Sequence, residues 1–282
     1  MKKTVLLLSI IALLMACGKS HDKKAQYKLD AAQKAFETGD FNQAKLEIDS
    51  IKILYPKAFQ ARRAGIALMQ EVELKEQEVT LAYLDSIETL RTDQLDSIKG
   101  NYTFEKNEEY QEIGNYFWPT QTVERNIHRT FLRFQVNERG VFTMTSFFVN
   151  TYNINHNRIK ITAPDGSFAE TPVSSDTYQT TDLGKKIEQA DFKYGEDGDL
   201  LNFIYLNADK TLRLDYLGDK SFSTTLLAAD KKALVGIYEL AQILRDLEQI
   251  RVNKEEAHLK IRFVKQKMEE RQAKEAEANS QK

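Results

Sequence analysis

The stretch that decides the fold is LAQILRDLEQIRVNKEEAHLKIRFVKQKM, residues 240–268. Apolar residues recur along it at heptad spacing, and Lys254 is the one polar residue on the resulting seam. The surrounding sequence from Ala228 to Ala276 contains no proline and one glycine. The pattern therefore predicts a long coiled-coil helix over residues 227–276, followed by a disordered tail over 277–282. The seam consists of Leu240, Ile243, Leu247, Ile250, Ala257, Ile261, Val264 and Met268.

A second long helix is predicted over residues 57–99. Pro56 ends the preceding helix and allows this one to begin, and no further proline occurs before Pro119. At 1.5 Å per residue the helix is about 65 Å long. Its second half contains Leu-Asp-Ser-Ile twice, starting at Leu84 and at Leu95. This eleven-residue spacing suits a straight or slightly right-handed supercoil.

Two long amphipathic helices that flank one segment most simply pair with each other. They would form an antiparallel coiled-coil stalk that carries the segment at its tip. The alternative is that each helix pairs with a second copy of the protein, which would give a homodimer through the long helices. The apolar spacing alone allows both arrangements.

The segment between the helices, residues 100–226, has the pattern of β-structure. β-Branched and aromatic residues alternate there with polar ones. Residues 131–136 and 141–145 are joined by Asn137-Glu138-Arg139-Gly140, which predicts a hairpin. We therefore expect an antiparallel, β-sandwich-like domain inserted between the helices, and an α+β fold for the whole chain.

Further strands are predicted later in the same segment. Residues 158–162 meet the turn Pro164-Asp165-Gly166, which is typical of a strand that ends in a tight turn. Residues 201–205 and 212–216 are apolar and aromatic runs linked through residues 207–210, so a second hairpin is expected there.

Residues 25–56 show helical spacing on both sides of a break at Gly39-Asp40. The segment Gly39-Asp40-Phe41-Asn42-Gln43-Ala44, followed by Ile48, Ile51 and Pro56, resembles the second half of a tetratricopeptide repeat. The first half departs from that family, with Lys28 and Ala32 where an aromatic residue and a glycine are usual. One repeat is visible, whereas about three are needed for a solenoid with a binding groove. The resemblance implies one helical hairpin, which either packs near a membrane or recognises a peptide.

The first seventeen residues have the layout of an export signal. Lys2 and Lys3 precede an apolar run over residues 5–15, which is shorter than the ~20 residues that span a bilayer. The sequence Leu14-Met15-Ala16-Cys17 resembles the lipobox of bacterial lipoproteins, in which the signal is cut before a cysteine that receives a diacylglyceryl group. The alternative is an ordinary signal peptide with a leftover thiol.

The lipobox resemblance implies a signal peptide over residues 1–16, lipidation of Cys17 and a tether over residues 17–24. Gly18 beside the cysteine resembles lipoproteins sorted to the outer membrane of Gram-negative bacteria. We therefore expect a lipid-anchored protein of the cell envelope that faces the periplasm. Since Cys17 is the single cysteine, the rest of the chain is expected to fold without a disulfide.

The net charge of the chain does not favour nucleic-acid binding. Without Lys2 and Lys3 the mature chain has 38 basic and 42 acidic residues, a net charge of −4. No nucleophile elbow and no phosphate-binding glycine loop is present. The segment Gly195-Glu196-Asp197-Gly198-Asp199 lacks the acidic pattern of a calcium loop and is expected to be a turn. The four histidines, which show no zinc-ligand spacing, are His21, His128, His156 and His258.

Two sets of residues are candidates for contacts or modification. Tyr110, Tyr116 and Trp118 belong to an aromatic cluster that either binds a ligand or partner or fills the core. Asp-Ser-Ile occurs three times and resembles the acceptor motif of a general O-glycosylation system of some Gram-negative bacteria, which implies sugars on Ser50, Ser86 and Ser97. The alternative for the second set is ordinary helical amphipathicity.

These expectations combine into a non-enzymatic envelope lipoprotein, anchored in the membrane through Cys17, that acts as a scaffold or adaptor. Its stalk and β domain would meet another envelope protein. The alternative is a lipoprotein whose β domain binds a glycan or another small ligand. We expect no catalytic residue, no metal and no cofactor, because no spacing selects a reaction centre.

Overall fold

The computed structural model describes residues 21–280, so the predicted signal peptide and Cys17 lie outside it. The chain divides into two compact units. The helical unit comprises the described residues up to Ser86 and from Val252 onward, and the β unit comprises Ile87–Arg251. The described residues contain five α-helices and two antiparallel sheets, which confirms the predicted α+β class.

Both predicted long helices are present. The first, α3, spans Phe59–Ile98, and the second, α5, spans Ala228–Ser280. Residues 277–280, where a disordered tail was expected, continue α5, and their sequence Glu-Ala-Asn-Ser follows a run of alanine and glutamate that favours helix. Each long helix contributes to both units.

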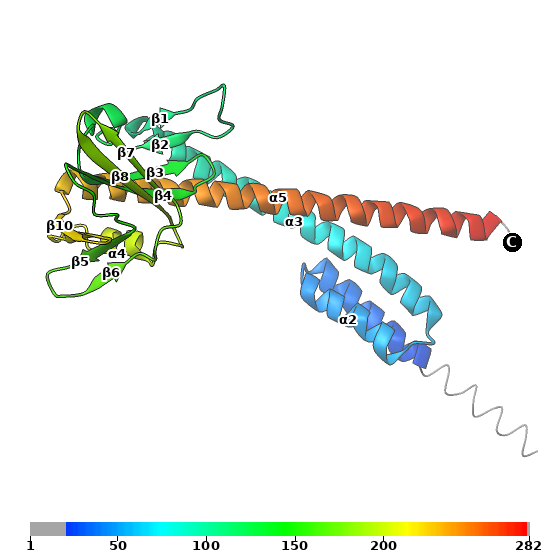
Figure 1. The fold of residues 1–282 in the computed structure, drawn as a ribbon. Coiled ribbons are helices and arrows are strands. Elements are labelled where there is room, and N and C mark those ends of the chain that lie inside the picture. The colour runs from blue at the N-terminus through cyan, green and yellow to red at the C-terminus, as the bar shows by residue number, and fades with distance from the viewer. Residues whose placement is uncertain (1–20, 281–282) are drawn as a thin grey trace, which may run out of the picture. The chain divides into compact units, whose positions relative to one another are not determined.

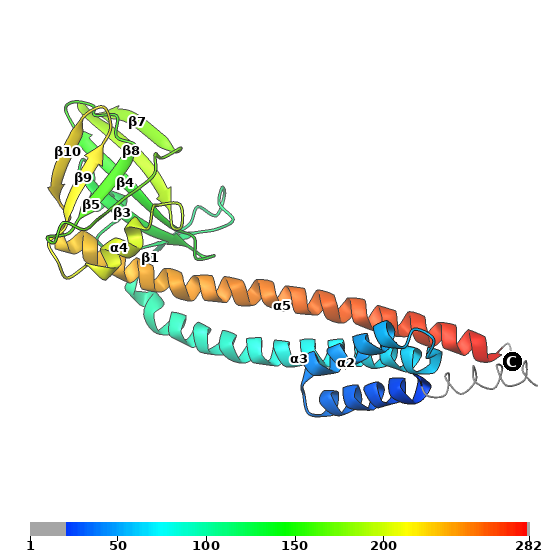
Figure 2. The same ribbon diagram turned by 90° about the horizontal axis from the view of Figure 1, so that it is seen from below.

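The helical unit begins with a helix over residues 21–37, followed by α2 (Phe41–Leu54). Figures 1 and 2 both show these two helices side by side, and Lys28 forms an ion pair of 2.7 Å with Glu47 between them. Gly39 in the connecting turn has φ +79°, a left-handed conformation that glycine adopts without a steric penalty. The Asp40 carboxylate then accepts a hydrogen bond of 3.0 Å from the N–H of Gln43 and caps α2.

Small side chains let the helices of this unit pack closely. A β-carbon on Gly65 of α3 would lie 3.4 Å from the side chain of Ile48 and 3.7 Å from that of Ile51. Small residues at these contacts bring the helix backbones close together, and larger side chains such as Ile48, Leu68 and Val72 fill the space between them. The buried alanines of the unit are Ala25, Ala32, Ala35, Ala44, Ala58, Ala61 and Ala257.

The β unit contains two antiparallel sheets (Figures 1 and 2). The six-stranded sheet has the order β1 (Thr103–Glu105), β2 (Asn115–Phe117), β3 (Phe131–Asn137), β4 (Phe142–Asn150), β8 (Lys185–Lys193) and β7 (Thr177–Asp182). The four-stranded sheet has the order β10 (Ser221–Thr225), β9 (Arg213–Leu217), β5 (Arg158–Thr162) and β6 (Phe168–Glu170).

The first predicted hairpin is confirmed as β3 and β4. Phe134 lies opposite Met144 in the register, and Gly140 in the turn has φ +76°. A β-carbon on Gly140 would come within 2.4 Å of the backbone nitrogen of Arg245 on α5. Glycine is therefore required here by the conformation of the turn and also by the contact with the helix.

The second predicted hairpin is wrong, because residues 201–205 are helical. They belong to α4 (Leu200–Leu206), which lies against β5 and β6 (Figure 1). Leu200, Leu201 and Ile204 are buried, a spacing that one face of a helix produces and an alternating strand does not. A short apolar run does not distinguish the two by itself, and β9 instead pairs with β10 and β5.

The turn before α4 explains why the run becomes a helix. Asp197 is buried, and its carboxylate accepts hydrogen bonds from the N–H groups of Gly195 at 2.9 Å and Leu201 at 2.7 Å. It satisfies an N–H of the first turn that has no partner within the helix. The acidic stretch is therefore a turn, as predicted, and it also caps α4.

One apolar core serves the whole β unit. Side chains from both sheets, from α4 and from the N-terminal part of α5 pack together in this single cluster. The largest fully buried members include Phe134, Phe142, Phe148, Ile159, Leu200 and Tyr216.

Replacement of the capping carboxylate tests this account of α4. Asp197→Ala removes two hydrogen bonds to backbone N–H groups, one of which is the buried N–H of Leu201, and we expect it to lower the free energy of unfolding of the β unit by about 1–2 kcal/mol. Glu196→Ala, in the same turn but exposed, is the matched control and should change it little. Chemical unfolding followed by Trp118 fluorescence measures both, and an equal effect of the two variants would contradict the capping role.

Candidate functional site

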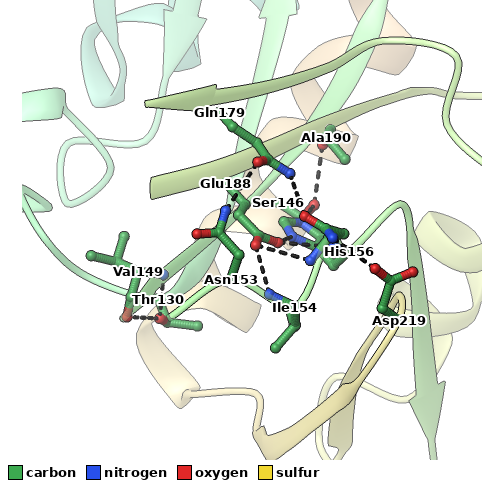
Figure 3. Close-up of polar contacts among 11 residues, drawn as sticks. Thr130, Ser146, Val149, Asn153, Ile154, His156, Gln179, Glu188, Ala190 and Asp219 are labelled. Carbon is green, nitrogen blue, oxygen red and sulfur yellow. Dashed lines mark hydrogen bonds and ion pairs between the residues drawn. The ribbon is translucent and has the colours of Figure 1, made fainter. Parts of the chain in front are cut away.

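Buried polar side chains from β4, from β8 and from the segment that leads into β5 are hydrogen-bonded to one another inside the β unit (Figure 3). The hydroxyl oxygen of Ser146 lies 2.8 Å from Nε2 of His156, and Nδ1 of the same ring lies 3.0 Å from Oε2 of Glu188. Ser146, His156 and Glu188 retain 0%, 2% and 1% of their exposable surface. These three residues are the Ser-His-Glu cluster.

Glu188 is the centre of the cluster. Its carboxylate accepts hydrogen bonds from three successive backbone N–H groups, those of Ile154 at 2.7 Å, Asn155 at 2.9 Å and His156 at 2.9 Å, in addition to the imidazole. Burial by itself would raise the pKa of Glu188, but these hydrogen bonds outweigh it and lower the pKa below its ordinary value. The group is therefore a buried carboxylate anion.

The protonation of His156 follows from its partners. Burial lowers the pKa of His156 below its ordinary value, although the hydrogen bond to Glu188 opposes that shift. The neutral ring carries its proton on Nδ1, where it can donate to the carboxylate, so Nε2 accepts from the Ser146 hydroxyl. A serine, a histidine and a carboxylate in this order are also found in acyl-transfer enzymes.

The Ser-His-Glu cluster is sealed from solvent. The rings of Phe148 and Tyr216 lie 6.3 Å and 5.3 Å from the imidazole, and the Ser146 oxygen also lies 3.2 Å from the carbonyl oxygen of Ala190. Ser146 therefore has no solvent-exposed surface. The cluster therefore acts as a clamp that holds residues 154–156 on β8.

The clamp extends to the edge of the six-stranded sheet. The amide of Gln179 on β7 accepts from Asn153 Nδ2 and donates to Asn155 Oδ1, both at 3.0 Å. Asn155 also donates to Asp219 at 2.7 Å and has φ +54°, a left-handed conformation that asparagine tolerates. The same segment that Glu188 holds therefore positions β7 (Figure 3).

β7 is an edge strand that is exposed along its whole length. All six of its residues are exposed, and among the strands of residues 21–280 it pairs with β8 alone. The N–H of Asp191 donates to the carbonyl of Asp176, and hydrogen-bonded pairs alternate in an antiparallel ladder. The backbone N–H and C=O groups of Thr177, Gln179 and Thr181 therefore point away from β8.

The turn that joins β7 to β8 carries an exposed apolar tip. Leu183 is 87% exposed and has φ +45°, an unfavourable conformation for a leucine. The Asp182 carboxylate lies 2.8 Å from Nε2 of His128, which belongs to the loop between β2 and β3. Ile127 in that loop is also exposed. We refer to β7 and Leu183 together as the β7 edge.

The aromatic residues predicted to contact a ligand do not form one surface. Trp118 is half-buried against the core, where it makes an edge contact of 5.6 Å with Tyr102 and covers Gly236 of α5. Tyr116 is also half-buried and packs on Phe104. Tyr110 lies in the β1–β2 loop and is 77% exposed.

The other predicted sites are dispersed. Ser50 lies in α2, and Ser86 and Ser97 lie on exposed positions of α3, so their glycosylation stays a prediction. Lipidation of Cys17 concerns a residue outside the described range. Among residues 21–280 no group of three or more histidine, cysteine or acidic side chains is placed to hold a metal ion.

Sequence reasoning missed both the Ser-His-Glu cluster and the β7 edge. A signal for the cluster was present, since Ser146 is in phase with the inward-facing Met144 and Phe148, and Glu188 is in phase with Ala190. Polar residues at inward positions of a strand need buried partners. The identity of those partners depends on strand register, which the sequence does not reveal.

Comparison with known proteins yields no match: no protein-family model, no curated protein and no solved structure matches the chain. None of the helices within residues 21–280 combines the length and the apolar character that crossing a membrane requires.

The clamp predicts a particular pH dependence of stability. Because folding lowers the pKa of His156, the unfolded chain binds a proton below pH ~6.5 that the folded chain does not, so stability falls as the pH falls through that value. Glu188 adds to this effect below pH ~4.5, because its pKa is lowered in the folded chain and the unfolded chain therefore takes up a proton first. One such proton changes the free energy of unfolding by at most about 1.4 kcal/mol per pH unit.

Replacement of His156 separates its contribution to the pH dependence of stability from that of the other titratable groups. We expect His156→Asn to be less stable at pH 8 and to lose part of the slope between pH ~6.5 and ~5. His258→Asn, at an exposed position of α5, is the control and should keep the slope. Unfolding curves at several pH values, read from Trp118 fluorescence, measure this slope, and an unchanged slope in His156→Asn would refute the assignment.

Proposed function

We propose that the protein is a non-enzymatic lipoprotein of the bacterial cell envelope that acts as an adaptor. A lipid on Cys17 anchors it in the outer membrane on the periplasmic side. Its long helices form a stalk, and its β unit binds an extended segment of another envelope protein. The β7 edge is the observation that carries the proposal.

An exposed edge strand is a natural site for strand addition. Its outward N–H and C=O groups match those of another extended chain, and proteins usually block such an edge with lysine, proline or a bulge. β7 has the sequence Thr-Tyr-Gln-Thr-Thr-Asp and carries neither lysine nor proline. Leu183 beside it offers an apolar contact for the partner. The Glu188 clamp holds the strand in place before a partner arrives, which reduces the entropy lost on binding.

Contacts between α3 and α5 support a stalk formed within one chain. In the helical unit, Lys254 lies 2.7 Å from Asp85. In the β unit, Arg91 lies 2.9 Å from Asp246. As the residue number rises along α3, the partner number falls along α5, which is the order expected for antiparallel helices. Lys254, the polar residue on the predicted seam, is thereby accommodated by an ion pair with α3.

The sealed cluster supports a non-enzymatic role. Ser146 has the neighbours of an activated nucleophile, but its side chain retains no exposed surface that a substrate could reach. Its hydrogen bonds are accounted for by the clamp on residues 154–156.

A second candidate function is the binding of a glycan at the four-stranded sheet. A hollow of about 500 Å³ lies on this sheet and is lined by Lys160, Phe168, Arg213 and Asp215, among others. Phe168 is 56% exposed, and the Lys160 ammonium lies 3.8 Å from the centre of its ring. A sugar would stack on the ring and bond to the charged groups. The predicted role of Trp118 in such a site has less support, because its ring is half-buried in the core.

A photo-crosslinking residue at position 178 tests the proposed function. Tyr178 on β7 is 60% exposed, so a benzophenone side chain there should capture a discrete partner in intact cells. The same probe at Phe168 is the control on the other sheet. An adduct formed at position 168 and not at 178 would favour the second candidate function.

A backbone variant tests whether the partner binds by strand addition. Thr181→Pro removes an outward N–H but no hydrogen bond to β8, so the fold should persist while the adduct at position 178 is reduced by about tenfold or more. Thr181→Val keeps the N–H and should retain the adduct. Equal capture by the two variants would exclude strand addition at this edge.

A further inference from the structure

Three helix ends meet in the part of the helical unit where the described residues begin. The ring of His21 lies 5.9 Å from the ring of Tyr55, which follows α2. Arg62 of α3 donates a hydrogen bond of 2.8 Å to the carbonyl of Pro56. These contacts bring the start of the first helix, the end of α2 and the start of α3 together. We call this region the anchor end.

A groove of about 1130 Å³ opens at the anchor end, between the first turns of α3 and the last turns of α5. Five basic residues and two acidic residues line it. The acidic ones are already matched, since Glu270 lies 2.9 Å from Lys267 and Glu275 lies 3.7 Å from Arg271. The surplus positive charge belongs to Arg62, Arg63 and Lys274.

This basic groove stands out in a chain with an overall negative charge. Three further lysines, Lys23, Lys24 and Lys57, are exposed in the segments next to His21 and Pro56 and add to its field, while Asp22 opposes it. A groove with an excess of cations attracts an anionic surface or ligand and concentrates it. The charge therefore selects an anionic occupant.

Apolar side chains in the same groove restrict the occupant further. Phe59 is 73% exposed and Ile66 is 56% exposed, and their separation of seven residues places them on one face of α3. Exposed aromatic and aliphatic groups beside cationic ones are typical of surfaces that lie in the head-group region of a membrane. A free inorganic anion would leave these apolar groups in water.

The position of the groove in the chain completes the argument. His21 is the fourth residue after Cys17, so the two residues lie at most about 14 Å apart along the chain. If Cys17 carries a lipid, the anchor end cannot leave the vicinity of the bilayer. Its charges then lie within about one to two Debye lengths of the lipid head groups at 0.1 M salt.

We propose that anionic lipid head groups occupy the groove between Phe59–Gln70 of α3 and Lys267–Asn279 of α5, so that the helical unit itself lies on the membrane. Arg62, Arg63 and Lys274 bind the phosphates, and Phe59 enters the interface. The location rests on the proposed lipidation of Cys17, but the binding chemistry does not. The contact would hold the helical unit at a defined place on the membrane, which a lipid on Cys17 alone would not do.

The test uses the mature chain with Cys17→Ser, which carries no lipid. Co-sedimentation is measured with vesicles of phosphatidylcholine containing about 30% phosphatidylglycerol, and with vesicles of phosphatidylcholine alone. We expect binding to the anionic vesicles only, with a steep loss as salt rises from about 0.05 to about 0.5 M. Equal binding to the neutral vesicles would overturn the proposal.

Charge-reversed variants locate the contact. Arg63→Glu with Lys274→Glu should reduce binding by about tenfold or more. Lys185→Glu with Lys220→Glu changes two exposed lysines of the β unit by the same net charge and should bind as the unchanged chain does. Equal losses in both double variants would show attraction by overall charge and would overturn the assignment to the groove. Circular dichroism verifies folding, and Arg63→Gln with Lys274→Gln gives a milder pair if the reversal unfolds the chain.

Two further readouts separate the remaining outcomes. If soluble polyglutamate displaces the chain from vesicles at equal charge concentration, the groove selects an acidic polypeptide and the lipid proposal fails. The mass of the protein isolated from cell membranes reports lipidation of Cys17 independently. Vesicle binding without lipidation would refute the anchor, whereas lipidation without vesicle binding would refute the groove.

Discussion

The buried carboxylate of Glu188 is the interaction on which the β unit depends most. It accepts three successive backbone N–H groups and an imidazole proton, and so fixes the irregular segment between the two sheets. Removal of any one donor would leave a buried charge with fewer partners, which is strongly destabilising. A fully satisfied polar network of this kind specifies one arrangement of a loop where apolar packing alone would allow several.

The same network also holds the edge strand of the larger sheet in position. Gln179 binds the asparagines that flank Ile154, so β7 is ordered by contacts on one side while its other side offers unpaired backbone groups. This division of roles explains why a serine, a histidine and a glutamate can lie in catalytic order without an accessible hydroxyl. The hydrogen bonds of these three residues position a loop. The polar groups available to a partner lie instead on β7, which that loop holds.

The helical unit follows a different principle. Alanine and glycine at the contacts bring helices close together, and charge is placed at their ends and on their surfaces. The excess of cations at the anchor end and the β7 edge of the other unit offer two chemically distinct surfaces, one suited to anionic lipid and one to an extended polypeptide. The proposed lipid-anchored adaptor would use one surface of each kind.

The sequence by itself determined the two long helices, the β3–β4 hairpin and the α+β class, because helical and strand periodicity and turn chemistry act over a few neighbouring residues. It did not determine α4, since a short apolar run satisfies both periods until the buried Asp197 caps it. It also did not reveal the Ser-His-Glu cluster or the β7 edge. Ser146 and Glu188 meet His156 only through the register of β4 with β8, and a strand becomes an edge only when the sheet order is complete. Those features depend on contacts between distant residues, which only the tertiary structure decides.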